Sequence, residues 1–212
     1  MIQFVRRFSE KRTPLPVVAT PSKSLAKWRG NRSEDLDEIE RAHAAVGGSS
    51  RGRRFATQQI NRAYAVLLAS QFQGFCRDLH SECVDHIMAA LAPTAALRTI
   101  IESELTRGRK LDSGNAQPGN LGEDFKRLGI DLWDEIYKLD NSNKARNALL
   151  ETLNRWRNAI VHQALDPSKL GGTTMLRLNE VRRWRVTCDR LATAFDEALC
   201  NHLQALTGTS PW

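Results

Sequence analysis

The chain has 212 residues and carries 31 Lys or Arg against 24 Asp or Glu, a net charge of +7. This length suits one domain that can bury a core, and no apolar run is long enough to cross a membrane. Alanine and leucine are abundant and no stretch alternates between apolar and polar residues for long, so the sequence predicts an all-α protein.

The positive charge is concentrated in residues 1–32. They hold eight basic side chains against Glu10 alone, a net charge of +7, whereas the remainder has 23 basic and 23 acidic residues. Three prolines and the absence of an apolar period predict an extended, flexible arm, followed by one helical domain over residues 33–212. Such an arm is compatible with a solvated tail, a contact to nucleic acid or to a partner subunit, or an organellar transit peptide.

Two helices are expected next. Ser33 is a suitable N-cap for a helix over 34–46, which the glycines and serines of 47–50 end. The longest apolar period predicts a helix over 55–91 that bends near Gly74. A basic cluster at the start of this helix is either a solvated face or an RNA contact: Arg51, Arg53 and Arg54.

Four cysteines occur without a CxxC pair or a secretion signal: Cys76, Cys83, Cys188 and Cys200. We therefore expect reduced thiols in a cytoplasmic protein. Cys76, His80 and Cys83 share one face of a helix and resemble a metal site. One straight helix rarely supplies three tetrahedral ligands, so core cysteines beside a hydrogen-bonded histidine are favoured. We expect neither a metal nor a cofactor.

The second half of the chain contains four more helical patterns, over 94–106, 123–139, 143–165 and 179–206. The intervening segment 108–122 is rich in glycine and is long enough to be a mobile or functional loop. Together these patterns predict a bundle of four or five core helices, in which the 55–91 helix packs against the 143–165 helix.

An arginine lies on the apolar face of the 143–165 helix. At 100° per residue, five apolar residues fall within roughly 60° of Arg157: Leu150, Leu153, Ile160, Val161 and Ala164. A buried, unpaired guanidinium is costly. We therefore expect an anion, a wet cleft between two subunits, or an internal salt bridge with a carboxylate such as Glu135 or Asp78.

Asn158 and His162 are four residues apart and share an edge of the same helix, beside that face. With Arg157 they provide a permanent cation, an amide and a side chain that titrates near neutral pH. This set suits a phosphodiester, since arginine binds the phosphate and histidine transfers a proton. Arg157 and His162 are about 140° apart on an ideal helix, whereas Arg155 lies about 20° from His162 and is an alternative partner.

The string Arg-Asn-Ala-Ile-Val-His over residues 157–162 resembles the RNxxxH signature of HEPN domains, an all-α family rich in ribonuclease toxins and RNA-processing enzymes. The resemblance implies a homodimer with a shared cleft and RNA cleavage by the 2′-hydroxyl without a metal. It implies that Arg157 polarises the phosphate, that His162 acts in proton transfer or phosphate binding, and that Asn158 orients them. Several related groups carry an acidic residue where this chain has Gln73.

The sequence thus favours a metal-independent endoribonuclease of the toxin or phage-defence kind, acting in the cytoplasm. RNA would contact Arg155 and the Arg51 cluster, and an antitoxin or another protein is a possible partner. The alternative is a non-catalytic HEPN-like module that binds RNA, a nucleotide or a protein.

Overall fold

The computed structural model describes residues 20–46 and 53–212, which form helices and connecting segments without a strand. This confirms the all-α class. No helix in these two ranges is both long and apolar enough to span a membrane. The elements are α1 (Lys23–Lys27), the turn η1 (Trp28–Arg32), α2 (Ser33–Val46), α3 (Arg53–Leu91), α4 (Ala95–Thr106), α5 (Lys110–Ser113), α6 (Pro118–Lys126), α7 (Leu132–Leu139), α8 (Asn143–Val161), the turn η2 (Pro167–Lys169) and α9 (Leu178–Thr207).

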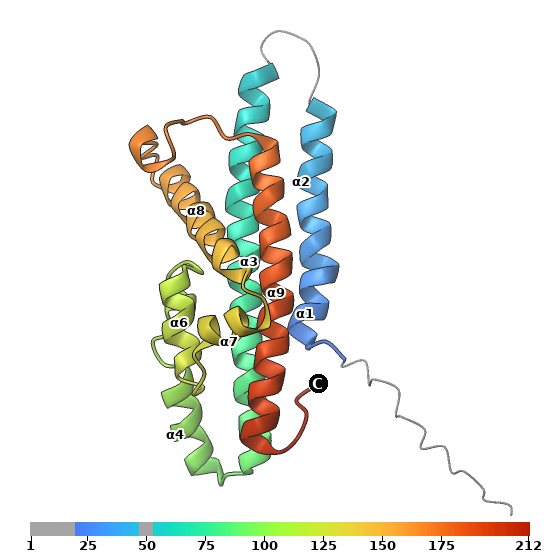
Figure 1. Ribbon diagram of the computed structural model, residues 1–212, viewed down its shortest axis with the longest axis vertical. Helices are drawn as coiled ribbons and strands as arrows, with labels where there is room; N and C mark the ends of the chain where they lie inside the picture. The colour runs from blue at the N-terminus through green and yellow to red at the C-terminus, as the bar shows by residue number, and fades with distance from the viewer. Residues whose placement is uncertain (1–19, 47–52) are drawn as a thin grey trace, which may run out of the picture.

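The bundle is built around α3 and α9, which lie side by side and run in the same direction (Figure 1). Asn61 of α3 donates to the carbonyl of Leu176, just before α9, and His86 contacts Thr207 at the far end. α2 runs antiparallel along α3, and α8 packs on both central helices. The C-terminal end of α8 diverges from the central pair, so this part of the helix lies at the edge of the bundle.

Aromatic rings fill the centre of the bundle. Phe72 of α3 lies 6.1 Å from Phe195 of α9, measured between ring centroids, and Phe195 also contacts Trp133 of α7 at 5.5 Å. Phe75 and Phe125 extend the same cluster, and all four phenylalanines are fully buried. Large rings bury much apolar area per side chain, so this cluster holds α3, α6, α7 and α9 together.

The domain begins earlier than the sequence indicated, because residues 20–32 pack on the bundle instead of forming an arm. Leu25 and Trp28 are each 2% exposed. The Trp28 ring contacts Phe72 and Phe75, with centroids 5.7 and 5.8 Å away. The boundary predicted at residue 32 therefore moves to about residue 20. Residues 1–19 lie outside the described residues.

Polar contacts fasten the same segment to α3. The carboxylate of Glu82 accepts from the backbone N–H groups of Lys23 and Ser24, each at 2.9 Å, and so caps the start of α1. Asp78 pairs with Lys27 and with Arg32, each at 2.9 Å. Two of the cations that the sequence analysis assigned to a flexible arm are thus bound to the folded domain.

α3 runs through Gly74, the expected site of a bend, as one uninterrupted helix. A Cβ at position 74 would lie 2.6 Å from Nη1 of Arg32. The glycine therefore lets the guanidinium lie directly on the helix, where it donates to Gln71 and Asp78.

The stretch between α4 and α8 differs from its predicted pattern. The expected loop 108–122 contains α5 and the start of α6, and the expected helix 123–139 is divided into α6 and α7. The division falls at Gly129, whose φ of +81° favours glycine. The carboxylate of Asp131 then accepts from the N–H of Asp134 and begins α7.

Candidate active site on helix α8

Four asparagines form a stripe along one face of α8, within about 60° of one another. Asparagine is a poor residue for a helix interior, so a side chain there needs a partner. Each amide binds the preceding part of the chain: Asn143 binds the Ile136 carbonyl at 2.8 Å, Asn147 the Tyr137 hydroxyl at 2.8 Å, Asn154 the Ala116 carbonyl at 3.0 Å, and Asn158 the amide of Asn115. This asparagine stripe fixes α8 against residues 115–137.

α8 ends at Val161, four residues before the predicted end. Gln163 adopts a φ of +54° and donates its N–H to the Ile160 carbonyl at 3.2 Å. The N–H of Ala164 donates to the Ala159 carbonyl at 2.9 Å, which completes a Schellman closure. His162 is the C-cap and its side chain is exposed where the backbone leaves the helix.

Arg157 is half-buried beside the asparagine stripe. Its Nη1 donates to Oδ1 of Asn158 at 3.2 Å, and no carboxylate within the described ranges forms an ion pair with it. The two carboxylates that could have formed an internal salt bridge are engaged elsewhere, Glu135 with Lys138 and Asp78 with Lys27 and Arg32. The guanidinium charge is therefore not compensated inside the described subunit.

The apolar face around Arg157 enters the core at only one end. Leu150 and Leu153 are buried, Ile160 is half-buried, and Val161 is 47% exposed. Ala164 is also exposed, because the helix ends before it. Arg157 thus lies where the face passes from core to surface, in a position that a ligand or a second subunit can reach.

A short segment before α6 covers the neighbouring part of α8. Asn154 binds the carbonyl of Ala116, and the Nδ2 of Asn115 donates to Oδ1 of Asn158. Asn120 closes the segment by donating to the Asn115 carbonyl at 2.8 Å. Arg157 and Asn158 are neighbours in the sequence and are joined by a hydrogen bond. Asn115 joins them from a segment that sequence reasoning left unassigned.

The remaining predicted site residues fall into two groups. The Arg155 side chain is exposed on α8, and the side chain of His162 forms no recorded hydrogen bond with the described part of the chain. Arg51 lies outside the described residues, and the side chains of Arg53 and Arg54 at the start of α3 are likewise not described. The convergence of Arg157, Asn158 and His162 on one ligand stays a prediction.

Gln73 has a structural role that an acidic residue could not fill. Its Nε2 donates to the carbonyl of Leu111 at 2.9 Å and so ties α5 to α3. A carboxylate has no proton to donate at neutral pH. The departure from the acidic residue found in related groups is therefore matched by a local hydrogen bond.

The cysteines and histidine of α3 are core residues. Cys76 and Cys83 are fully buried thiols, and burial raises the pKa of both. His80 is fully buried, hydrogen-bonded to the Asp124 carbonyl at 3.1 Å and to Nη1 of Arg109 at 3.3 Å. Burial, followed by the Arg109 charge, lowers the pKa of His80 to about 4. These contacts confirm the interpretation of core cysteines beside a hydrogen-bonded histidine.

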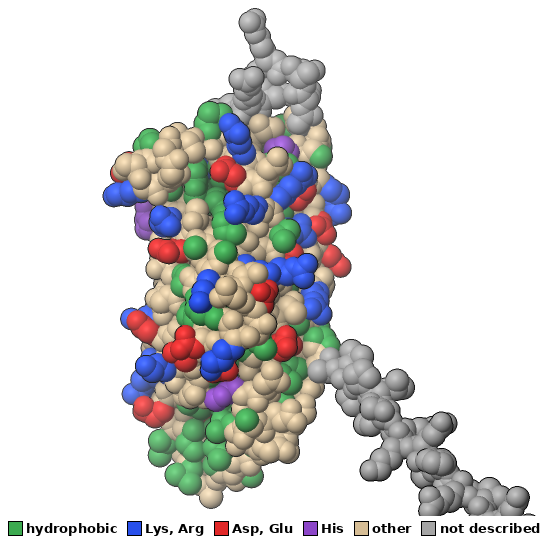
Figure 2. All heavy atoms as spheres, in the orientation of Figure 1, with side chains coloured by type: hydrophobic (Ala, Val, Ile, Leu, Met, Phe, Trp, Pro, Cys, Tyr) green, Lys and Arg blue, Asp and Glu red, His purple; other side chains and the backbone are tan. Residues whose placement is uncertain are grey.

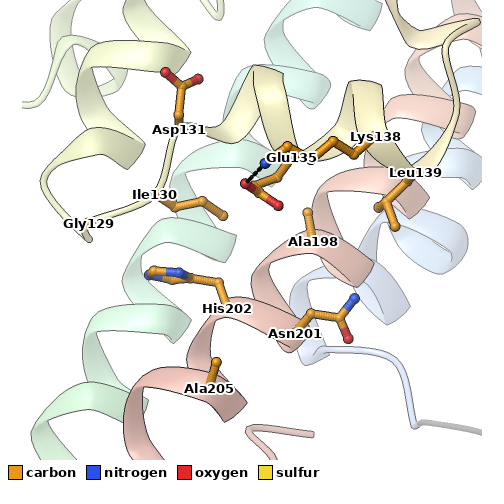
Figure 3. Close-up of a pocket in the computed structure, with 10 residues that line it drawn as sticks. All are labelled: Gly129, Ile130, Asp131, Glu135, Lys138, Leu139, Ala198, Asn201, His202 and Ala205. Atoms are coloured by element: carbon orange, nitrogen blue, oxygen red, sulfur yellow. Dashed lines mark hydrogen bonds and ion pairs between the residues drawn. The ribbon is translucent and has the colours of Figure 1, made fainter.

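A hollow of about 420 Å³ between α7 and α9 contains none of the motif residues (Figure 3). Its charged pair, Glu135 and Lys138, is joined at 2.6 Å, and Nε2 of His202 is hydrogen-bonded to the Leu128 carbonyl at 2.9 Å. Its α9 residues begin at Ala198, roughly 20 Å along the helix from Trp184, the ring that packs on Trp156 of α8. We therefore assign the candidate site to α8 and not to this hollow.

Charged side chains of both signs are interspersed over the face shown in Figure 2, while apolar side chains gather at its lower end. Leu97 and Ile100 of α4 and Leu91 of α3 are among the exposed apolar residues of the described part. The mixed charge agrees with the neutral composition of the chain beyond its first 32 residues.

The described residues form an all-α helical bundle, as HEPN domains do. The chain belongs to the RiboL-PSP-HEPN family, whose sequence model matches residues 31–201. No curated protein matches the chain, and no solved structure matches it. The family match confirms the resemblance inferred from the motif and covers α2 to α9 apart from the last turns of α9.

Two polar residues of the site region were missed by sequence reasoning, Asn115 and Asn154. The spacing of asparagines at 143, 147, 154 and 158 was the available signal, because it places four poor helix formers on one face. That pattern predicts partners for the face. It does not say that one partner would be Asn115.

Proposed function

We propose that the protein is a metal-independent endoribonuclease of the HEPN type, acting as a toxin or in phage defence. The observation that carries this proposal is the state of Arg157, a half-buried cation whose guanidinium is bound to the Asn158 amide and to no carboxylate of the described residues. Exposed His162 lies at the end of the same helix. A cation and an imidazole at the exposed end of one helix suit a phosphodiester substrate if a ligand or a second subunit brings them together.

In the proposed reaction the 2′-oxygen of RNA attacks the adjacent phosphorus while the bond from phosphorus to the 5′-oxygen breaks. The products are a 2′,3′-cyclic phosphate and a free 5′-hydroxyl. Arg157 stabilises the charge on the non-bridging oxygens, and Asn158 holds it in place. His162 moves the proton, either from the 2′-hydroxyl or to the departing 5′-oxygen.

We further propose that two subunits complete the site. Arg157 and His162 point about 140° apart on an ideal helix, and His162 follows the last helical residue. A two-fold arrangement would bring Arg157 of one subunit near His162 of the partner and would cover exposed Val161. RNA is then the expected ligand of the shared cleft, with Arg155 beside it.

Cleavage of single-stranded RNA by the full chain tests the proposal. Activity should survive excess EDTA, spare DNA of the same sequence, and leave 2′,3′-cyclic phosphate ends. Arg157→Ala and His162→Ala should each lower the cleavage rate by roughly 10²-fold. Arg157→Lys should be similarly impaired, because lysine lacks the planar guanidinium fork. Arg77→Ala, which removes an exposed charge on α3, is the matched control and should leave the rate unchanged.

Each variant must melt near the wild-type temperature before its rate is interpreted, since Arg157 is half-buried. Magnesium-dependent cleavage, or full activity in a folded His162→Ala variant, would refute the proposal.

The second candidate function is a non-catalytic module that binds RNA, a nucleotide or a protein such as an antitoxin. The observation that favours it is the hydrogen bond from the Gln73 amide to the Leu111 carbonyl, at a position where related groups carry an acidic residue. RNA binding that depends on Arg157, with intact RNA recovered after long incubation, would select this function over the ribonuclease.

A further inference from the structure

The segment from Gly114 to Gln117 is fixed from several sides. Asn154 of α8 binds its Ala116 carbonyl at 3.0 Å, and Asn120 of α6 binds its Asn115 carbonyl at 2.8 Å. Just upstream, the buried carboxylate of Asp124 accepts from the N–H groups of Lys110 and Leu111, each at 2.9 Å. The side chain of Asn115 is therefore presented to α8 by backbone that is held on both sides.

The contact between Asn115 and Asn158 determines which way the Asn158 amide faces. Arginine can only donate hydrogen bonds, so the Asn158 atom that meets Nη1 of Arg157 must be the oxygen. The same oxygen accepts from Nδ2 of Asn115. With Oδ1 held by two donors, the Nδ2 group of Asn158 is turned away from both, and it donates to no acceptor of the described residues.

We propose that Asn115 is a positioning residue that acts through Asn158. By holding Oδ1, it keeps the two N–H donors of Asn158 available for a phosphate oxygen and supports the oxygen against which Arg157 rests. The anion would then meet an arginine and an amide donor from adjacent positions of α8. This inference rests on the proposed function, and it adds a residue from outside the Arg-Asn-x-x-x-His string.

Removing the Asn115 donor should allow the Asn158 amide to rotate. A rotated amide would present its oxygen to the phosphate, where two acceptors repel each other. The aspartate variant of Asn115 should be worse than the alanine variant, because a carboxylate attracts the Nδ2 group of Asn158 and favours the rotated form.

A double-mutant cycle on RNA cleavage by the full chain tests the route of action. Asn115→Ala should lower kcat about tenfold with KM within about twofold, as expected for one lost hydrogen bond. In an Asn158→Ala background the same change should have no further effect on kcat. Arg77→Ala, which removes an exposed side chain of α3 outside this segment, is the control and should keep kcat within about twofold.

An equal loss in both backgrounds would overturn the proposal, because Asn115 would then act independently of Asn158. Wild-type kcat in a folded Asn115→Ala variant would overturn it as well. Rescue of kcat by Asn115→Ser, whose hydroxyl can donate, would support it against a purely structural role.

A second measurement does not depend on catalysis. Titration with inorganic phosphate, followed by the side-chain amide resonances of Asn158, should shift those resonances in the wild-type protein and much less in Asn115→Ala and Asn115→Asp. Equal shifts in all three proteins, or no shift in the wild type, would reject the positioning role. RNA left intact by the wild type would refute the ribonuclease while the phosphate titration still decides the role of Asn115.

Discussion

Replacing Trp28 by alanine tests whether the segment before α2 belongs to the folded domain. Trp28 is 2% exposed, its ring lies against Phe72 and Phe75, and its Nε1 donates to Asp189 at 3.0 Å. The substitution removes a large buried ring and leaves the Asp189 carboxylate without this donor. Large-to-small changes of an aromatic residue in a core cost about 3–5 kcal/mol, so we expect a loss near 4 kcal/mol.

That loss is a large part of the roughly 5–15 kcal/mol by which domains are stable. Urea unfolding followed by circular dichroism should show a lower midpoint with an unchanged slope. Trp28→Phe should recover a substantial part of the stability, since a ring remains against Phe72. Deletion of residues 1–19 is the matched control and should leave the free energy of unfolding within about 0.5 kcal/mol of the wild-type value.

Deletion of residues 1–19 and deletion of residues 1–32 distinguish the electrostatic contribution of the N-terminal segment to RNA binding from its contribution to stability. Residues 1–19 contain four basic residues and Glu10, so their removal should flatten the salt dependence of RNA binding without unfolding the bundle. Removal of residues 1–32 also deletes Leu25 and Trp28 and should destabilise the domain more than Trp28→Ala does. Equal stability of the two truncated proteins would show that residues 20–32 are an arm after all.

Two further predictions concern pH and assembly. His80 has its pKa lowered to about 4, mainly by burial, so the unfolded chain binds its proton first as pH falls. The free energy of unfolding should therefore decrease by roughly 3 kcal/mol between about pH 6.5 and pH 4. The decrease should be smaller in His80→Gln. The same dependence of the free energy of unfolding on pH in both proteins would contradict this. Sedimentation at micromolar concentration should give about twice the subunit mass of 23.9 kDa, whereas a monomer would reject the shared cleft.

The long helices were predictable because each repeats its apolar pattern over many turns. The predicted ranges 55–91 and 179–206 differ from α3 and α9 by two residues or fewer at each end. The stretch over 108–139 was not predictable in this way. Its helices are short, and Gly129, in the turn between α6 and α7, adopts a backbone conformation that sequence periodicity does not report.

The N-terminal segment was missed for a different reason. Residues 20–32 are too few to show an apolar period, and their four basic residues suggested a solvated arm. Their partners, Asp78 and Glu82, lie about fifty residues away on α3. Local composition cannot distinguish a basic residue that pairs with a carboxylate distant in the sequence from a basic residue that faces solvent.

The helical wheel correctly placed Arg157 on the same face of the helix as buried leucines. It did not predict that the end of this face, near Arg157, would be exposed. Leu150 and Leu153 are buried on the face that Arg157 shares, but α8 ends at Val161, so the far end of this face is exposed. Glu135 and Asp78 are both paired with other cations. A cation at the edge of a core, with its internal candidates engaged and an asparagine amide beside it, is poorly explained as a structural element of one subunit. This arrangement is the reason we propose an anion from outside the chain, and RNA is the ligand to test first.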